Sequence, residues 1–127
     1  MQEQHLFEYA VIRVMPRVER GEFVNVGVIV YCAARRYLQC RYVLNPGRLH
    51  AFSVDLDLND LETRLQAFGR VCRGGKDGGP IGALPIASRF RWLTATRSTV
   101  VQTSPVHPGF CTEGEEVLER LFGELVL

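Results

Sequence analysis

The stretch FVNVGVIVYC, residues 23–32, decides the fold of this 127-residue chain. It is rich in β-branched residues, which favour strands, and its even positions from Val24 to Cys32 form one apolar face. Similar strand patterns lie on either side, at Phe7–Met15 and Tyr37–Leu44, and the link Ala33–Arg36 is short. The three segments therefore predict an antiparallel meander.

The apolar faces also predict the register of these strands, because a slip of one residue would turn every side chain to the wrong face. Matching the faces places Arg13 opposite Asn25, Cys40 opposite Val28, and Arg41 opposite Gly27. This register argues against a disulfide between Cys40 and the end of the second strand. It predicts a polar patch on the other face of the sheet, formed by Arg13, Asn25, Gly27 and Arg41. A glycine inside a strand often marks a close approach by backbone or ligand.

Helical periodicity appears in three places. Residues Leu58–Arg73 carry an apolar stripe that predicts an amphipathic helix, with a capping box at its start and Gly74 as its stop. Residues Pro85–Leu93 predict a short helix. A C-terminal helix follows the second capping box and carries the stripe Val117, Leu118, Leu121, Phe122 and Leu125. The two capping boxes are Asn59 with Glu62 and Thr112 with Glu115.

The remaining segments are punctuated by glycine and proline. Thr99–Thr103 predicts a fourth strand closed by Pro105 and Pro108, residues 45–47 predict a turn, and residues 74–80 predict a flexible glycine-rich loop. The expected fold is therefore α+β, with about four strands in a mainly antiparallel sheet and two or three helices packed on it. The C-terminal helix is expected to cover the face formed by Val24, Val26, Val28 and Val30. The length predicts one domain, residues 1–127.

Composition limits the function classes. The hydrophobic fraction of 46% and charged fraction of 23% are typical of a soluble globular protein. The net charge of +1 gives no signal for nucleic acid or membrane. The apolar run Val24–Cys32 is too short to span a bilayer, and residues 1–8 contain no apolar signal-peptide core. We therefore expect a cytoplasmic protein with no membrane partner.

Arginines are the distinctive residues, since only Lys76 among the 15 basic residues is a lysine. They gather in two strand-like stretches, residues 7–32 and 88–111, where a buried guanidinium needs a partner inside the protein or from a ligand. Arginine beside Trp92 suits stacking on bases or anchoring a protein interface. Internal pairing with Glu8, Glu19 or Glu22 is an equal alternative, and whether the two stretches form one site stays open. The candidate binding residues are Arg13, Arg17, Arg20, Asn25, Arg89, Arg91, Trp92, Arg97, Ser98, Thr99, Gln102 and His107.

No catalytic or metal-binding motif accompanies these arginines. Residues 69–77 contain Gly-Gly-Lys but lack the spacing and the Ser/Thr of a phosphate-binding loop. The four cysteines contain no CxxC pair, so zinc is disfavoured and small core residues are the simplest interpretation. His107 near Cys111 has no evident carboxylate partner, and the aspartates lie away from the arginine stretches, which disfavours a nuclease. We predict no catalytic residues, no metal and no cofactor; whether the protein is an enzyme stays uncertain, leaning towards no.

The same stretches carry a family resemblance. Residues 9–14 (YAVIRV) and 18–29 (VERGEFVNVGVI), followed by 90–93 (FRWL), 97–102 (RSTVVQ) and 104–109 (SPVHPG), resemble the signatures of an uncharacterised bacterial family, domain of unknown function 3037. The resemblance implies a small bacterial cytoplasmic protein, often encoded beside a HipA-like kinase. The leading hypothesis is a non-catalytic accessory module that binds a protein partner, with that kinase as the candidate. The alternative is an enzyme or binding domain for a phosphate-containing small molecule or nucleic acid.

Overall fold

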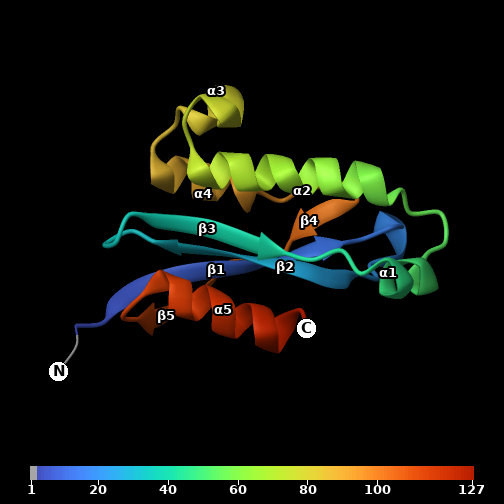
Figure 1. The fold of residues 1–127 in the computed structure, drawn as a ribbon, viewed down its shortest axis with the longest axis horizontal. Coiled ribbons are helices and arrows are strands. Elements are labelled where there is room, and N and C mark those ends of the chain that lie inside the picture. Colours follow the sequence, from blue (N-terminus) through green and yellow to red (C-terminus); the bar gives the residue numbers. More distant parts are fainter. Residues whose placement is uncertain (1–2) are drawn as a thin grey trace.

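The computed structural model describes residues 3–127 and has one antiparallel sheet between two helical layers (Figure 1). Within these residues the strand order is β3-β2-β1-β4, and β5 also pairs with β1. Strand β1 therefore holds β2 along one edge and both β4 and β5 along the other. The predicted α+β class is confirmed. The strands are β1 (His5–Val14), β2 (Val24–Cys32), β3 (Tyr37–Tyr42), β4 (Val101–Thr103) and β5 (His107–Cys111).

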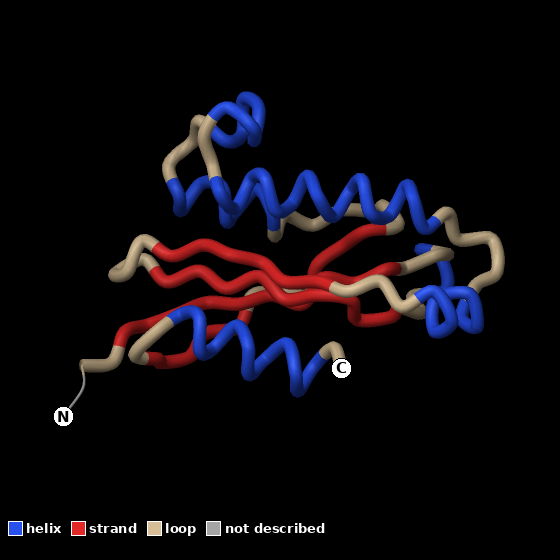
Figure 2. Tube along the Cα trace, in the orientation of Figure 1, coloured by secondary structure: helices blue, strands red, loops and turns tan. Residues whose placement is uncertain are grey.

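Five α-helices complete the described part of the chain. Figure 2 shows α2 along one face of the sheet and α5 along the other, with α1 at one end of the sheet. None of these helices is long and apolar enough to cross a membrane. The helices are α1 (Pro46–Phe52), α2 (Leu58–Arg73), α3 (Gly79–Gly82), α4 (Ile86–Leu93) and α5 (Gly114–Leu125).

A β-bulge in β2 changes which side chains face which layer. Ile12 pairs with Gly27 and Arg13 pairs with Asn25, so Val26 is the extra residue on β2. Val24 and Val26 belong to the core under α2, whereas the residues beyond the bulge, Val28, Val30 and Cys32, lie under α5. The prediction that α5 covers the whole Val24–Val30 face is thus wrong for its first half, because the bulge interrupts the two-residue period.

The register between β2 and β3 also differs from the sequence prediction. Cys40 lies opposite Ile29 and Arg41 opposite Val28, one residue from the expected pairs. Because both faces of β2 are covered, an apolar match on one face alone does not fix the register. Arg13, Asn25 and Arg41 share the α5 face, while Gly27 lies on the α2 face, so the four do not form one patch. Gly27 marks a backbone approach, since a Cβ there would lie 2.7 Å from the carbonyl oxygen of Arg41.

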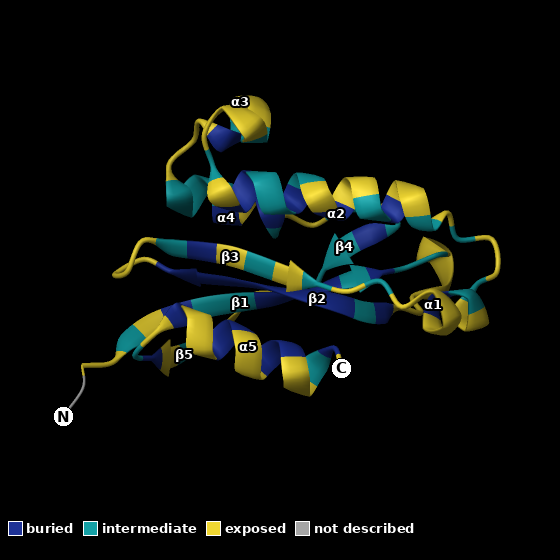
Figure 3. Ribbon diagram, in the orientation of Figure 1, coloured by how far each residue is buried: buried dark blue, intermediate teal, exposed yellow. Residues whose placement is uncertain are grey.

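Two apolar cores result, one on each side of the sheet (Figure 3). Eight of the nine β2 residues are buried, as expected for a central strand with covered faces. The core under α2 and α4 contains Ile12, Ile29, Leu49, Leu61, Leu65 and Leu93. The core under α5 contains Phe7, Val28, Val30, Val117, Leu118, Leu121 and Phe122.

Strand β5 replaces the turn that the prolines predicted. Pro108 lies within β5, which among the strands of residues 3–127 pairs only with β1, and its other edge tolerates a residue without an N–H. Ser104 fills the gap between β4 and β5. Its backbone amide donates to the carbonyl of Val11 (2.8 Å), and its hydroxyl accepts from the amide of Val11 (2.8 Å) and donates to the carbonyl of Pro105 (2.9 Å). The hydroxyl thus continues the β1 ladder where the chain changes strand.

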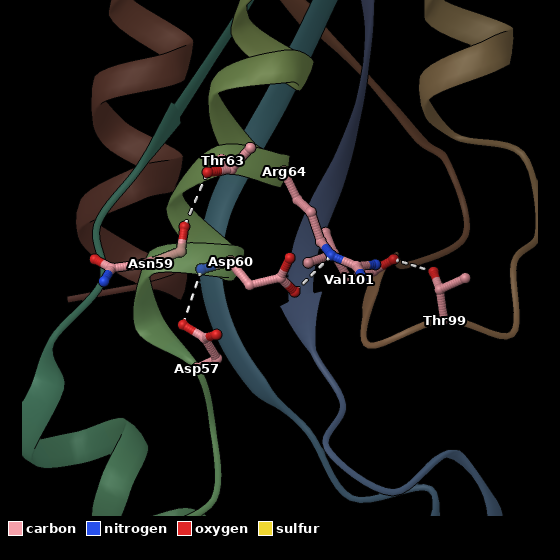
Figure 4. A network of polar contacts seen from close by, with 7 residues as sticks. All are labelled: Asp57, Asn59, Asp60, Thr63, Arg64, Thr99 and Val101. Atoms are coloured by element: carbon pink, nitrogen blue, oxygen red, sulfur yellow. Dashed lines mark hydrogen bonds and ion pairs between the residues drawn. The ribbon is translucent and has the colours of Figure 1, made fainter.

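Helix starts are capped differently from the prediction. The carboxylate of Asp57, rather than Asn59, accepts from the backbone amide of Asp60 at 3.1 Å, while Arg64 donates to Asp60 one turn later at 2.9 Å (Figure 4). Helix α5 begins after Glu113 with no side-chain cap. Glu115 instead accepts a hydrogen bond from Tyr37 at 3.0 Å, so the second predicted capping box does not form.

Two connections contain helix where the sequence predicted a turn or a loop. Asn45 caps α1 by accepting from the amide of Arg48 at 3.0 Å, and Pro46 occupies the first turn, where its missing N–H costs nothing. Residues 74–80 form a 3-10 turn at Lys76–Gly78 and the start of α3. Gly74 ends α2 as predicted, with its amide donating to the carbonyl of Arg70. The mobility of residues 74–80 stays a prediction.

Candidate binding site

A row of polar side chains crosses the sheet on the α5 face. Arg13 of β1 lies between Asn25 of β2 and Gln102 of β4, so this part of the two arginine-rich stretches does converge. The guanidinium of Arg13 stacks over the ring of Phe23 at 4.0 Å from its centroid. Among the described residues, Nε of Arg13 and Oδ1 of Asn25 are buried without a hydrogen-bond partner. The row therefore keeps one free donor and one free acceptor.

Beside this row lies the α1 groove, which we define by the residues that line its two adjoining halves. One half, of about 340 Å³, lies between the loop after β1 and the end of α1. The other half, of about 460 Å³, extends over the start of β2, and the two share Ala51 and Phe52. Phe23 and Phe52 are 40% and 39% exposed. The lining residues are Pro16, Arg17, Arg20, Glu22, Phe23, Val24, Asn25, Arg48, Ala51, Phe52 and Ser53.

The two loop arginines of the α1 groove carry their own counter-ions. Arg17 pairs with Glu19 at 2.9 Å, and Arg20 pairs with Glu22. Hydrogen bonds from its own backbone amide and from Arg17 lower the pKa of Glu19. Glu19 and Glu22 therefore form local ion pairs with these arginines, which is the internal pairing that the sequence analysis gave as an alternative. The loop presents paired charges, not bare guanidinium.

Helix α5 closes one side of the α1 groove through its C-terminal carbonyl groups. The side-chain amide of Asn25 donates to the carbonyl of Leu125 at 3.2 Å, and Arg48 donates to the carbonyl of Val126 at 2.9 Å. These bonds satisfy carbonyl oxygens that a helix end leaves unpaired. The positive charge of Arg48 also suits the C-terminal end of a helix, where the helix dipole is negative. Strand β2, α1 and α5 are thereby joined at one end of the molecule.

Arg89 has a structural position. Its guanidinium donates to the carbonyls of Val71 (2.9 Å) and Cys72 (2.8 Å) at the end of α2, and its Nε donates to Leu84 (3.1 Å). Gly74 has a φ of +75°, which favours glycine, and a Cβ there would also lie 2.7 Å from this guanidinium. Arg89 is thus engaged with backbone rather than directed at a ligand.

Arg97 has the same kind of role at the end of α4. It donates to the carbonyl of Leu93 at 2.8 Å and to that of Trp92, and its guanidinium lies 4.7 Å from the Trp92 ring centroid. Burial lowers the pKa of Arg97. Trp92, Arg97 and Thr99 line a shallow depression of about 250 Å³ against α2. Arg91, on the same helix, is exposed.

The remaining candidate binding residues either form local hydrogen bonds or are exposed to solvent. Thr99 donates to the carbonyl of Val101 at 2.7 Å (Figure 4), and Gln102 donates to that of Thr99 at 2.7 Å. Ser98 and His107 are exposed, and the His107 ring packs 5.3 Å from that of Tyr9 across β1 and β5. Metal ligands do not cluster in residues 3–127: no three His, Cys, Asp or Glu side chains converge there.

The predicted candidates thus divide into two groups. Arg13, Arg17, Arg20 and Asn25 lie in or beside the α1 groove, joined by Gln102 through the strand pairing. The α4 residues belong to the opposite layer. Sequence reasoning missed Arg48 and Phe52 because residues 45–47 looked like a turn. The asparagine before Pro46 was a usable signal, since Asn at N-cap followed by Pro at the first position favours a helix start.

Comparison with known proteins places this α+β chain in a family. A family model described as "protein of unknown function (DUF3037)" matches residues 9–126. The chain therefore belongs to this family, as its two signatures indicated. No curated protein and no solved structure matches it.

Proposed function

We propose that this protein is a non-catalytic binding module whose α1 groove docks a protein partner, with a HipA-like kinase as the candidate. The observation that carries the proposal is the pairing of exposed Phe23 and Phe52 with arginines around one groove. Aromatic residues and arginine are enriched at protein interfaces and supply most of their hot spots. The kinase itself rests on the family resemblance alone.

Charge balance favours a protein over a phosphate-bearing ligand. Glu19 and Glu22 neutralise the loop arginines and would repel a phosphate backbone. Arg89 and Arg97 are engaged with carbonyl oxygens of α2 and α4. A protein surface can exchange partners with such ion pairs at the rim of an interface, where they contribute mainly to specificity.

The test is co-expression with the HipA-like kinase followed by size-exclusion chromatography. We expect co-elution at micromolar concentration. Phe52→Ala should weaken binding by 2 kcal/mol or more, about 30-fold, if the ring is a central contact. Independent elution of the two proteins at that concentration would contradict the kinase as partner.

Trp92→Ala is the matched control. Trp92 and Phe52 are equally exposed, at 39% each, but lie on different layers of the molecule. Trp92→Ala should leave the affinity unchanged. A larger loss from Trp92→Ala than from Phe52→Ala would place the interface at α4 and refute the α1 groove.

A phosphate-containing small molecule or nucleic acid is the second candidate for the same region. The observation in its favour is the buried Nε of Arg13, which lacks a hydrogen-bond partner among the described residues. Phosphate contacts release counter-ions, so binding would weaken as salt increases. A nucleotide and oligonucleotide panel that gives no thermal shift at low salt would remove this candidate.

A further inference from the structure

Strand β3 leaves one of its two edges unpaired. It is the end strand of the sheet in residues 3–127, and β2 is its only strand partner there. In an antiparallel pair, residues that bond to the partner strand alternate with residues whose amide and carbonyl point away from it. The bond from the amide of Val43 to the carbonyl of Val26 (2.8 Å) fixes this alternation. The outward groups therefore belong to Leu38, Cys40 and Tyr42.

The accessible part of this edge is at Cys40 and Tyr42. Both residues are partly exposed, whereas Leu38 is only 2% exposed. No backbone hydrogen bond from elsewhere in the described chain reaches their outward groups. We define the β3 edge as the outward amide and carbonyl groups of Cys40 and Tyr42. An extended peptide can pair with such groups as an added strand.

A depression of about 270 Å³ lies beside the β3 edge, between β3 and α2. Gly69, inside α2, forms part of its wall, although a glycine within a helix costs about 1 kcal/mol relative to alanine. A Cβ at this position would lie 3.3 Å from Nη1 of Arg73, so the arginine side chain lies against the glycine. Guanidinium groups therefore lie next to unpaired backbone. The lining residues are Cys40, Tyr42, Gln66, Gly69, Arg70 and Arg73.

The charge of this depression is positive. Arg70 and Arg73 form no ion pair with a described carboxylate. The nearby carboxylate of Glu62 already accepts hydrogen bonds from the Tyr42 hydroxyl at 3.0 Å and from the Gln66 amide at 3.2 Å. Two unpaired arginines beside one engaged carboxylate favour an anionic occupant, because arginine pairs strongly with carboxylate.

Charge also decides which occupant fits. If the β3 edges of two copies paired antiparallel, both α2 helices would lie on the same side of the joined sheet, and their arginines would repel one another. Residues of an added strand opposite Cys40 and Tyr42 would point to the same side as those two side chains. A strand with carboxylates at two positions separated by one residue would therefore place both beside Arg70 and Arg73.

We propose that the β3 edge binds an acidic, extended segment of a protein partner as an additional antiparallel strand. The outward groups of Cys40 and Tyr42 bond to the backbone of that segment. Its glutamate or aspartate side chains enter the depression and pair with Arg70 and Arg73. This surface shares no lining residue with the α1 groove, so either site can exist without the other.

The first experiment uses the full chain and a fluorescein-labelled peptide of alternating threonine and glutamate, with fluorescence anisotropy as the signal. We expect binding that weakens as salt increases, and no binding of a peptide with glutamine in place of glutamate. The paired variant Arg70→Gln/Arg73→Gln should weaken binding about tenfold, because hydrogen bonds to charged groups are lost. Equal binding of the two peptides would refute the proposal.

The matched control is Arg35→Gln/Arg120→Gln, which removes the same charge from exposed arginines in the β2–β3 turn and on α5. It should leave the affinity for the glutamate peptide unchanged. Urea unfolding of both paired variants checks stability, because Arg70 and Arg73 also suit the negative end of the α2 dipole. Equal affinities of the two paired variants would show that the depression does not hold the carboxylates.

Hydrogen exchange measured by NMR tests the backbone pairing. Saturating glutamate peptide should slow exchange at the amides of Cys40 and Tyr42, whereas the amides of Gln39 and Arg41, which bond to β2, should not change. Peptide binding without this protection would overturn strand addition. Exchange at Cys40 and Tyr42 that slows with rising protein concentration, without peptide, would show that a second copy occupies the edge and would also overturn the proposal.

Discussion

The hydrogen bonds of Arg97 allow its structural and ligand-binding roles to be separated. Its guanidinium bonds to the carbonyls of Leu93 and Trp92, and no described carboxylate forms an ion pair with it. We expect Arg97→Ala to destabilise the protein by about 1.5–3 kcal/mol, as is usual for hydrogen bonds to a charged group. The change in the free energy of unfolding is measured by urea denaturation, with circular dichroism as the signal.

Arg91→Ala is the control, because the Arg91 side chain is exposed on α4 and makes no hydrogen bond or ion pair to a described residue. Arg91→Ala should change the free energy of unfolding by no more than about 0.5 kcal/mol. A ligand-binding role for Arg97 predicts the opposite result for Arg97→Ala: an unchanged or raised melting temperature with loss of binding. That result would identify Arg97 as a ligand-binding residue despite its carbonyl contacts.

Gly27 gives a second prediction at this scale. A Cβ there would meet the backbone oxygen of Arg41 at 2.7 Å and the Cβ of Tyr42 at 2.9 Å, neither of which can move freely within the sheet. Gly27→Ala should therefore cost roughly 1–3 kcal/mol. Gly123→Ala on the exposed side of α5 meets nothing within 4 Å and should instead stabilise the protein, by about 0.5–1 kcal/mol. Chemical denaturation of both variants checks the opposite signs.

Single residues were predicted best where the signal was local. The stop at Gly74 and the Arg13–Asn25 pair are confirmed. The engagement of Arg89 with the end of α2 was not predictable, because Val71 and Cys72 are distant in sequence and expose only backbone oxygens to it. No side-chain pattern encodes such a partner.

At the scale of elements, two tyrosines join β3 to the helices on either side. Tyr42 donates to Glu62 of α2, and Tyr37 donates to Glu115 of α5, each at 3.0 Å. Burial, followed by the hydrogen bond to Glu62, raises the pKa of Tyr42 from 10.0 to about 12. Burial and Glu115 raise the pKa of Tyr37 as well. In both cases the neutral phenol is favoured in the folded state.

These shifts predict a loss of stability at alkaline pH. The pKa of Tyr42 is higher in the folded state than in the unfolded state. The contribution of the neutral Tyr42 side chain to the free energy of unfolding is therefore fully present below pH 10 and is lost as pH rises through about 12. The urea midpoint should fall across this interval, and less steeply in Tyr42→Phe. Parallel pH curves for the two proteins would show that the hydrogen bond to Glu62 does not hold the neutral form.

Elements with a clear period were predictable from the sequence, and irregular ones were not. The bounds of α2 are those predicted, because its apolar stripe runs for the whole helix. The bulge at Val26 left no mark on the alternation of valines, so the assignment of faces was wrong for Val24 and Val26 and right for Val28 and Val30. Strand β5 was concealed by Pro105 and Pro108, whose compatibility with a sheet edge depends on tertiary position.

At the scale of the whole molecule, β1 and β2 contribute side chains to both cores. Loss of packing in one layer should therefore unfold the other. Leu65→Ala under α2 and Leu121→Ala under α5 should each cost about 2–5 kcal/mol and keep one cooperative transition. Glu124→Ala, exposed on α5, should change stability by no more than about 0.5 kcal/mol. Two separate calorimetric transitions in either leucine variant would contradict a single domain.

The pairing of β1 with β4 and β5 has a kinetic consequence. Residue 5 pairs with residue 111 and residue 14 with residue 101, so the first strand to leave the ribosome waits for the last ones. Ribosomes add about 5–20 residues per second, which leaves one edge of β1 open for several seconds of synthesis. Contacts of such long sequence separation also slow folding in a test tube. In a nascent chain, one edge of β1 therefore stays open to pairing with other strands until residues 101–111 have been synthesised.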